Sequence, residues 1–208
     1  MAVFLKWLEL IFPPRESEQR VRDATEEAVL ALLAPLVLPS RVVSLLPYQH
    51  PLVASLIQEA KYHQSEKAWK LLGSVLAAYL REFVIEEDMF NEHPFALIPM
   101  PLSEKRKVVR GYNQTEEVVR GALRILELPE APHTRVLKRI RDTASQTHLS
   151  RKARLQNMTH AFEASEVDPR TTYLLIDDVV TTGATFEDAA RALTEGGASR
   201  VVCVALAH

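Results

Sequence analysis

The chain has 208 residues, of which 47% are hydrophobic and 25% charged, and its formal net charge is −2. That length accommodates one main α/β domain with additions, and the hydrophobic content is ample for a core. The single cysteine, Cys203, lies in an apolar run, which favours a buried thiol over a disulfide or a nucleophile. A reducing, cytoplasmic location fits this cysteine usage.

The first twelve residues are apolar but contain Lys6 and Glu9. This stretch is too short to span a bilayer, and it has no small-residue cleavage site. We therefore expect a cytosolic protein with no membrane span. An amphipathic stretch of this kind can also lie on a membrane surface or on a partner, although packing on the protein's own core is the commoner fate.

The first part of the chain has helical periodicity. The spacing of apolar residues predicts a helix over 16–38, ended by Pro35 and Pro39, and further helices over 51–62 and 66–83. We expect residues 1–90 to form an N-terminal helical region packed on the core.

The second part alternates strands and helices, which favours a mostly parallel α/β sheet flanked by helices. We expect residues 91–208 to form this domain. Its predicted strands are 95–100, 136–140, 173–176 and 200–207. Its predicted helices begin near Asn113 or Thr115 and at Phe186, and Gly196-Gly197 ends the last one. We expect residues 143–157 to form a polar loop that passes into a helix.

The segment 173–185 carries the strongest chemical signal. Its apolar start has the composition of a strand buried on both faces, and Asp177 and Asp178 follow near the carboxyl end, where ligands of open α/β sheets bind. Residues 181–185 then supply hydroxyls and backbone N–H groups before a helix whose N-terminus suits a phosphate. The alternative is a simple helix cap by Thr182 or Thr185.

Charge is unevenly distributed. Residues 99–157 hold thirteen Lys or Arg against six Asp or Glu, whereas the remainder holds twelve against twenty-one. Such a positive field suits a polyanionic substrate such as a diphosphate, and it equally suits a nucleic-acid backbone. Charge alone does not separate the two.

The paired acids and the TTGAT loop resemble the 5-phosphoribosyl-1-pyrophosphate (PRPP) motif of type I phosphoribosyltransferases. By this resemblance Asp177 and Asp178 are the catalytic residues and hold the 2′- and 3′-hydroxyls of ribose. The loop that would bind the 5′-phosphate consists of Thr181, Thr182, Gly183, Ala184 and Thr185. Magnesium would accompany PRPP, with no metal ligand assigned to the protein.

A second resemblance covers most of residues 45–208. The segments that carry it are IPMPLS with the following RGYNQ, LIQEAKY at 56–62, and Thr143, Gln146, Arg151, Arg154 and Asn157 with Phe162. Together they resemble the competence protein F (ComF) family, which is regarded as phosphoribosyltransferase-like and is in part associated with DNA uptake. The pyrophosphate site implied by the family comprises Met100, Pro101, Leu102, Ser103, Arg106 and Arg110. The implied mobile hood over PRPP comprises Thr143, Gln146, Arg151 and Arg154.

The sequence departs from the family at its N-terminus. Many members open with a four-cysteine zinc site, but residues 11–45 contain no cysteine. A structural zinc needs four thiolate or imidazole ligands at short spacing, so we expect no zinc.

Simpler interpretations remain for several cations. Lys105, Arg106 and Lys107 also fit a solvated loop, and Lys61 fits either a structural role on its helix or a ligand role. Arg110 is better supported because Gly111 permits a tight turn beside it.

The resulting hypothesis is an enzyme that transfers the phosphoribosyl group of PRPP to an unidentified acceptor. One alternative is a non-catalytic PRPP- or nucleotide-sensing accessory protein that works with DNA-uptake or DNA-processing proteins. Another is direct binding of single-stranded DNA, which needs aromatics beside the cations. In the basic run, Tyr112 is the aromatic at hand.

Overall fold

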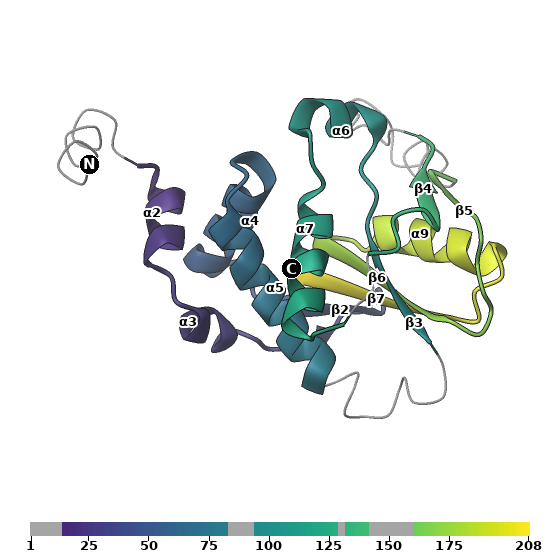
Figure 1. The fold of residues 1–208 in the computed structure, drawn as a ribbon, viewed down its shortest axis with the longest axis horizontal. Coiled ribbons are helices and arrows are strands. Elements are labelled where there is room, and N and C mark those ends of the chain that lie inside the picture. Colours follow the sequence, from purple (N-terminus) through teal and green to yellow (C-terminus); the bar gives the residue numbers. More distant parts are fainter. Residues whose placement is uncertain (1–13, 83–93, 129–131, 142–159) are drawn as a thin grey trace.

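The computed structural model describes residues 14–82, 94–128, 132–141 and 160–208. Within them, five strands form one sheet in the order β1-β2-β7-β6-β3, and two more form a separate hairpin (Figure 1). The strands of the sheet are β1 (Leu36–Val37), β2 (Val42–Leu46), β3 (Phe95–Pro99), β6 (Thr172–Val179) and β7 (Arg200–Ala207). The hairpin consists of β4 (Leu137–Arg139) and β5 (Phe162–Ala164). Because β2, β7, β6 and β3 run parallel, the predicted α/β architecture is confirmed.

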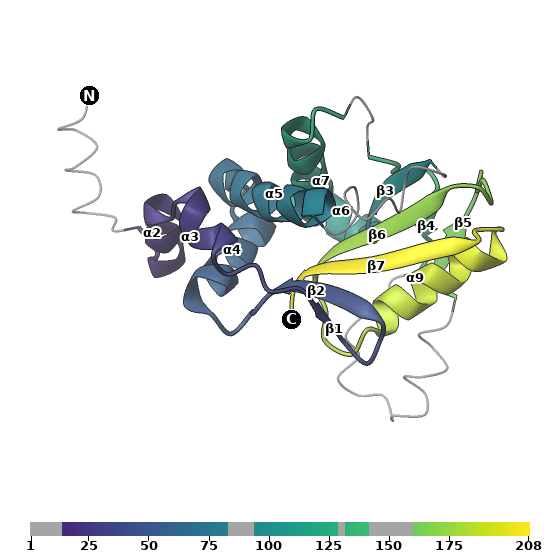
Figure 2. The ribbon, with the colours of Figure 1, turned by 90° about the horizontal axis from the view of Figure 1, so that it is seen from below.

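Helices cover both faces of the sheet. They are α2 (Glu16–Asp23), α3 (Glu26–Leu30), α4 (Pro51–Tyr62), α5 (Glu66–Leu80), α6 (Glu104–Arg110), α7 (Gln114–Ile125) and α9 (Ala184–Glu195). In Figure 2, α5 and α7 lie on one side of the sheet and α9 on the other. The side chains of β6 alternate accordingly: Leu174 and Ile176 belong to the core under α4, α5 and α7, whereas Tyr173 and Leu175 belong to the core under α9.

The predicted helix over 16–38 is wrong. The chain forms α2 and α3, separated by Ala24 in an extended conformation, and then the hairpin β1-β2. Thr25 starts α3 anew because its hydroxyl accepts the N–H of Ala28. The region expected to be helical, 1–90, therefore also supplies β2, which pairs with β7 inside the sheet.

The next two predicted helices are confirmed as α4 and α5. Pro51 occupies the first turn of α4, and the imidazole of His50 accepts the N–H of Leu52 at 3.3 Å. The buried carboxylate of Glu59 on α4 accepts hydrogen bonds from Ser17 and Arg15, at 2.7 and 3.1 Å. This pair of contacts fixes α2 against α4.

In the second part, α7 begins after Asn113 as predicted, and its side chain accepts the N–H of Thr115. Helix α6 and strand β5 were not predicted. The strands predicted at 95–100, 136–140 and 200–207 correspond to β3, β4 and β7.

None of the helices in the described part of the chain has the length and apolar character needed to cross a bilayer.

Candidate functional site

The carboxyl ends of the parallel strands lie at one edge of the sheet, called here the carboxyl edge. The N–H of Met100, just after β3, donates to the carbonyl of Ile176 on β6 at 2.7 Å. The N–H of Val180, just after β6, donates to the carbonyl of Ala207 on β7 at 3.0 Å. The two loops that the sequence associates with pyrophosphate and with ribose phosphate are therefore neighbours.

Asp178 points into the helical layer. The residue is 6% exposed, and both carboxylate oxygens are bonded to protein side chains. The ammonium of Lys61 lies 2.8 Å from Oδ1, and the side-chain amide of Gln114 donates to Oδ2 at 2.5 Å. Since Lys61 comes from α4 and Gln114 from α7, this one carboxylate ties two helices to β6.

Asp177 points to the opposite face, as the alternation of β6 requires. It is partly exposed, and Oδ1 accepts the N–H of Asp178 at 2.8 Å. Burial, and then repulsion from Asp178, raise the pKa of Asp177 to about 7, against the opposing charges of Lys61 and Arg139. Within the pair, Asp177 is thus the carboxylate with room for a ligand.

The loop 181–185 runs from the strand into α9. Thr181 and Thr182 are exposed, and the hydroxyl of Thr182 accepts the N–H of Ala184 at 3.4 Å. The residue that precedes the helix is Gly183, with φ +83° and no side-chain cap, so the alternative of a threonine cap is wrong. The N–H groups of the first helical turn point past this loop, which is the arrangement that binds phosphate in other proteins.

Gly183 also contacts the tip of the β1-β2 hairpin. A Cβ at position 183 would lie 2.4 Å from the Cβ of Ser40. Two features therefore require a glycine at this position: the left-handed backbone conformation and the close approach of Ser40. Nothing in the sequence pattern connects residue 40 with residue 183, and this contact was not predicted.

The predicted pyrophosphate segment is part loop and part helix. Met100 and Ser103 are buried, and the Ser103 hydroxyl accepts the N–H of Arg106 to start α6. The interpretation of Lys105, Arg106 and Lys107 as a loop is wrong, because they lie on this helix, which forms the top of the molecule in Figure 1. Pro101 and Leu102 are half-buried between β3 and the helix.

Arg110, at the end of α6, is drawn back toward the sheet. Its Nη1 donates to Oε1 of Gln114 at 2.9 Å, and its guanidinium lies 5.3 Å from the centre of the Tyr62 ring. Tyr112 is held inward, since its hydroxyl donates to the carbonyl of Lys61 and its ring packs on Trp69. The aromatic side chain exposed beside the cations is Tyr62, at 63%.

No protein-family model matches the chain. Competence protein F of Haemophilus influenzae is 34% identical over 118 residues, which are 55% of this chain and 51% of that protein. Competence protein ComFC of Streptococcus pneumoniae is 35% identical over 132 residues, 63% of this chain and 54% of that protein. DNA utilization protein YhgH of Salmonella typhi is 29% identical over 167 residues, 77% of this chain and 69% of that protein.

The chain therefore resembles the ComF proteins. It spans about half the length of the two competence proteins. The family resemblance predicted from the sequence is confirmed, while the zinc-free N-terminus, the magnesium and the phosphoribosyltransferase chemistry stay predictions.

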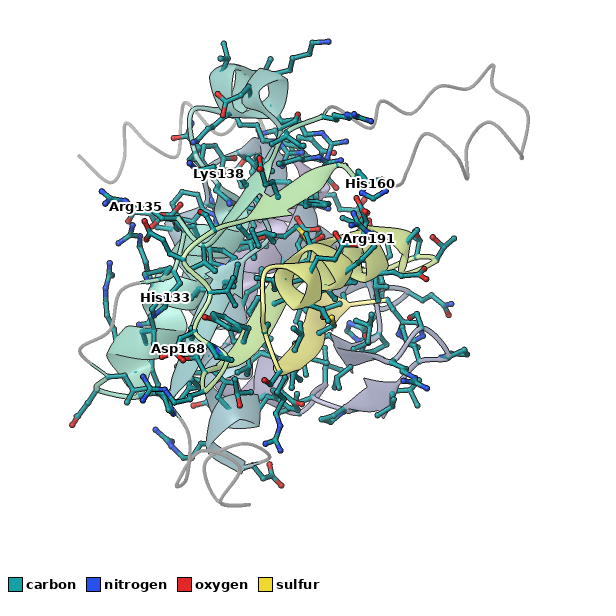
Figure 3. The ribbon with its side chains drawn as sticks, turned by 90° about the vertical axis from the view of Figure 1, so that its right-hand side faces the viewer. His133, Arg135, Lys138, His160, Asp168 and Arg191 are labelled. Carbon is teal, nitrogen blue, oxygen red and sulfur yellow. The ribbon has the colours of Figure 1, made fainter. Side chains whose placement is uncertain are left out.

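Another buried carboxylate lies on α9. Asp188 accepts the N–H groups of His160 and Ala161, each at 2.8 Å, and pairs with Arg191 at 2.6 Å. Figure 3 shows His160 and Arg191 beside each other at this helix. Burial works to raise the pKa of Asp188, but these hydrogen bonds outweigh it and lower the pKa. The contact fixes the backbone just before β5.

Sequence reasoning identified several residues that the fold brings together and missed others. Asp177, Asp178, Arg110 and the loop 181–185 all lie at the carboxyl edge. The predicted hood residues Thr143, Gln146, Arg151 and Arg154 lie outside the described residues. No local signal pointed to Ser40, to Gln114 as a bridge, or to Arg139 near Asp177.

Proposed function

We propose that this protein binds PRPP at the carboxyl edge and transfers its phosphoribosyl group to an acceptor, releasing pyrophosphate. The observation that carries the proposal is the hydrogen bond from Met100 to Ile176. It places the segment 100–110 beside the acids and the loop 181–185, so that one extended ligand with a phosphate at each end can reach both.

The ligand would lie with its 5′-phosphate on the loop 181–185, against the N-terminus of α9. Asp177 would accept the ribose hydroxyls, since it is the partly exposed member of the pair. Arg110, with donors beyond the one given to Gln114, would bind the leaving pyrophosphate. These positions put positive charge at the bond that breaks and negative charge beside the ribose that becomes cationic.

Magnesium fits this arrangement as a companion of the ligand. In the described part of the chain, no group of three or more His, Cys, Asp or Glu residues could hold a metal ion. Magnesium in proteins is commonly held by one or two carboxylates together with substrate phosphates, and Asp177 is the carboxylate placed for this. When bound, the ion would neutralise charge on the diphosphate.

Calorimetric titration with PRPP and magnesium tests the proposal. Asp177→Ala should weaken binding more than Asp178→Ala, because Asp178 is already bonded within the protein. The double variant should lose binding altogether, because it removes the charge-assisted hydrogen bonds of Asp177, worth about 1.5–3 kcal/mol each, together with the support that Asp178 gives to the site. Asp168→Ala is the matched control, because that carboxylate pairs with Arg170 before the opposite end of β6. Unchanged affinity in the double variant would remove the acids from the site.

The acceptor is to be found by offering bases and amines with PRPP and measuring released pyrophosphate. Release that depends on one acceptor supports a transferase. If the protein binds PRPP but releases no pyrophosphate with any acceptor offered, the non-catalytic accessory role is supported. In that role PRPP changes the affinity of the protein for a DNA-processing partner. The names of the relatives, competence and DNA utilization proteins, favour such a partner.

Single-stranded DNA is a second candidate ligand, favoured by the exposed ring of Tyr62. Tyr62 lies beside Arg110, the last residue of α6, which is the combination of aromatic and positive charge that binds unpaired bases. Tyr62→Ala should then weaken oligonucleotide binding at low salt, while Tyr48→Ala, at another exposed tyrosine, leaves it unchanged. Absence of oligonucleotide binding at low salt would exclude this role.

A further inference from the structure

Gln114 occupies an unusual position for a glutamine. It is the first residue of α7 and is 3% exposed, so its side-chain amide must be satisfied by the protein. One end of the amide accepts from Arg110 at 2.9 Å, and the other donates to Asp178 at 2.5 Å. The residue therefore forms a direct bridge between the arginine of the pyrophosphate segment and a carboxylate of the ribose motif.

The orientation of this amide is dictated by its partners. A guanidinium can only donate and an ionised carboxylate can only accept, so rotating the amide by 180° would lose both bonds. Gln114 cannot release one partner and improve its contact with the other by a simple flip.

The two ends of the bridge are fixed by different parts of the fold. Asp178 is also held by Lys61 of α4, at 2.8 Å from Oδ1. The guanidinium of Arg110 also lies over Tyr62, the residue after Lys61. Lys61, Asp178, Gln114, Arg110 and Tyr62 thus form a closed ring of contacts, in which a displacement at one member is felt by the others.

We propose that Gln114 is a positioning residue that couples the pyrophosphate end of the site to its ribose end. The inference rests on the proposed function, because it assigns Arg110 to pyrophosphate and the acids to ribose. Pyrophosphate bound to Arg110 restrains that side chain, the restrained arginine holds Gln114, and Gln114 holds Asp178 in place next to Asp177. When one ligand has ordered these side chains, the second ligand no longer has to order them. Pyrophosphate and the ribose phosphate therefore bind with positive cooperativity.

The test uses two probes, inorganic pyrophosphate with magnesium and ribose 5-phosphate. The dissociation constant of ribose 5-phosphate is measured by calorimetry with and without saturating pyrophosphate. In the wild type we expect saturating pyrophosphate to lower the dissociation constant of ribose 5-phosphate by about tenfold, which is within the usual range of coupling between two sites. In Gln114→Met, which keeps the length of the side chain but neither hydrogen bond, the factor should fall to about one.

Thr115→Val is the matched control. Thr115 is the next residue of α7 and is 1% exposed, and its hydroxyl has no hydrogen-bond partner among the described residues. It should keep the wild-type coupling factor. A Gln114→Met protein that retains the factor, or a wild type that binds both probes independently, would overturn the inference and leave the proposed function intact. A wild type that binds neither probe would defeat the proposed function itself.

A second readout does not depend on how the variant folds. In glutamine-labelled wild-type protein, the side-chain NH₂ signals of Gln114 should shift on adding either probe, because each end of its amide bonds one half of the site. Signals that respond to neither probe, or to one alone, would contradict the coupling.

Discussion

Two parts of the carboxyl edge differ in how their polar groups are satisfied. On the side of α4 and α7, Asp178 has both oxygens bonded to protein side chains and is nearly inaccessible. On the side of α9, Thr181 and Thr182 are exposed, and Asp177 is partly exposed, with one carboxylate oxygen that accepts the backbone N–H of Asp178. The first part is complete without a ligand, and the second offers donors and acceptors to one.

The difference separates two roles that the paired acids seemed to share. Asp178 gains little from a new partner, because a ligand cannot reach a carboxylate that is nearly inaccessible and already bonded on both oxygens. Its contribution is to hold Lys61 and Gln114 in place. We therefore assign the support of the site to Asp178 and the contact with ligand to Asp177.

The largest effect is expected from removing Lys61, the cation that pairs with Asp178 on the side of α4 and α7. Lys61→Met leaves Asp178 buried with a single partner, and we expect a loss of about 3 kcal/mol in the free energy of unfolding, at the lower end for such pairs because Lys61 is partly exposed. Urea denaturation measures it. Lys70→Met, at an exposed position on α5, should cost less than about 0.5 kcal/mol. Equal losses in the two variants would show that Asp178 does not depend on Lys61.

The next largest effect is expected in the loop on the other side. Gly183→Ala adds a Cβ that collides with Ser40 at a left-handed φ of +83°, and should cost about 2–3 kcal/mol. Gly111→Ala has a similar φ of +74° with nothing within 4 Å, and should cost only about 1 kcal/mol. Adding Ser40→Gly to Gly183→Ala should recover the difference, as measured by thermal or urea unfolding. Equal costs at both glycines would mean that the hairpin does not press on the loop.

A smaller effect is expected in the pH dependence of stability that Asp177 contributes. Its pKa is raised from 3.8 to about 7, so between these values the folded protein binds the proton more tightly than the unfolded chain does. Stability contributed by this group is therefore lost as pH rises through that window. Asp177→Asn removes the dependence and should be about 1–2 kcal/mol more stable than the wild type at pH 8, since partial solvent access limits the effect. The two proteins should be alike near pH 4, and a constant difference across the range would contradict the shift.

The smallest effect is expected at Thr115 on α7, whose buried hydroxyl is not satisfied, among the described residues, as its polar neighbours are. Thr115→Val replaces a buried hydroxyl that lacks a partner in the described part of the chain with a methyl of similar size. We expect a gain of about 1 kcal/mol or less, because the desolvation cost of the hydroxyl disappears. Chemical denaturation beside the wild type measures it, and a loss of stability would indicate a partner, such as a buried water.

Local signals gave most of the elements correctly. The helices α4, α5 and α7 follow from apolar spacing with clear caps, and the strand before Asp177 from its continuous apolar run. The segment 16–46 was misread because Val29, Leu32 and Leu33 continue a helical spacing across a break made by Ala24 and Thr25. Strand β2 was missed as well, because an apolar run of only five residues does not by itself indicate a strand.

The site was predictable only in part. The motif positions fell at the carboxyl edge because strand ends and glycine-rich loops are local features of the sequence. The partners of Asp178 were not predictable, because Gln114 is 64 residues away and Lys61 comes from another helix. Which of two adjacent acids faces solvent depends on the register of β6 between its neighbours, and a single sequence does not specify it.

The strand order has a consequence for how the protein is made. Strand β7 lies between β2 and β6, although it follows every other element in the chain. While a ribosome is still synthesising residues 200–207, β2 and β6 have no shared neighbour and their apolar edges stay open. The whole sheet can therefore form only after residues 200–207 have been synthesised, which makes its folding depend on contacts between distant parts of the sequence.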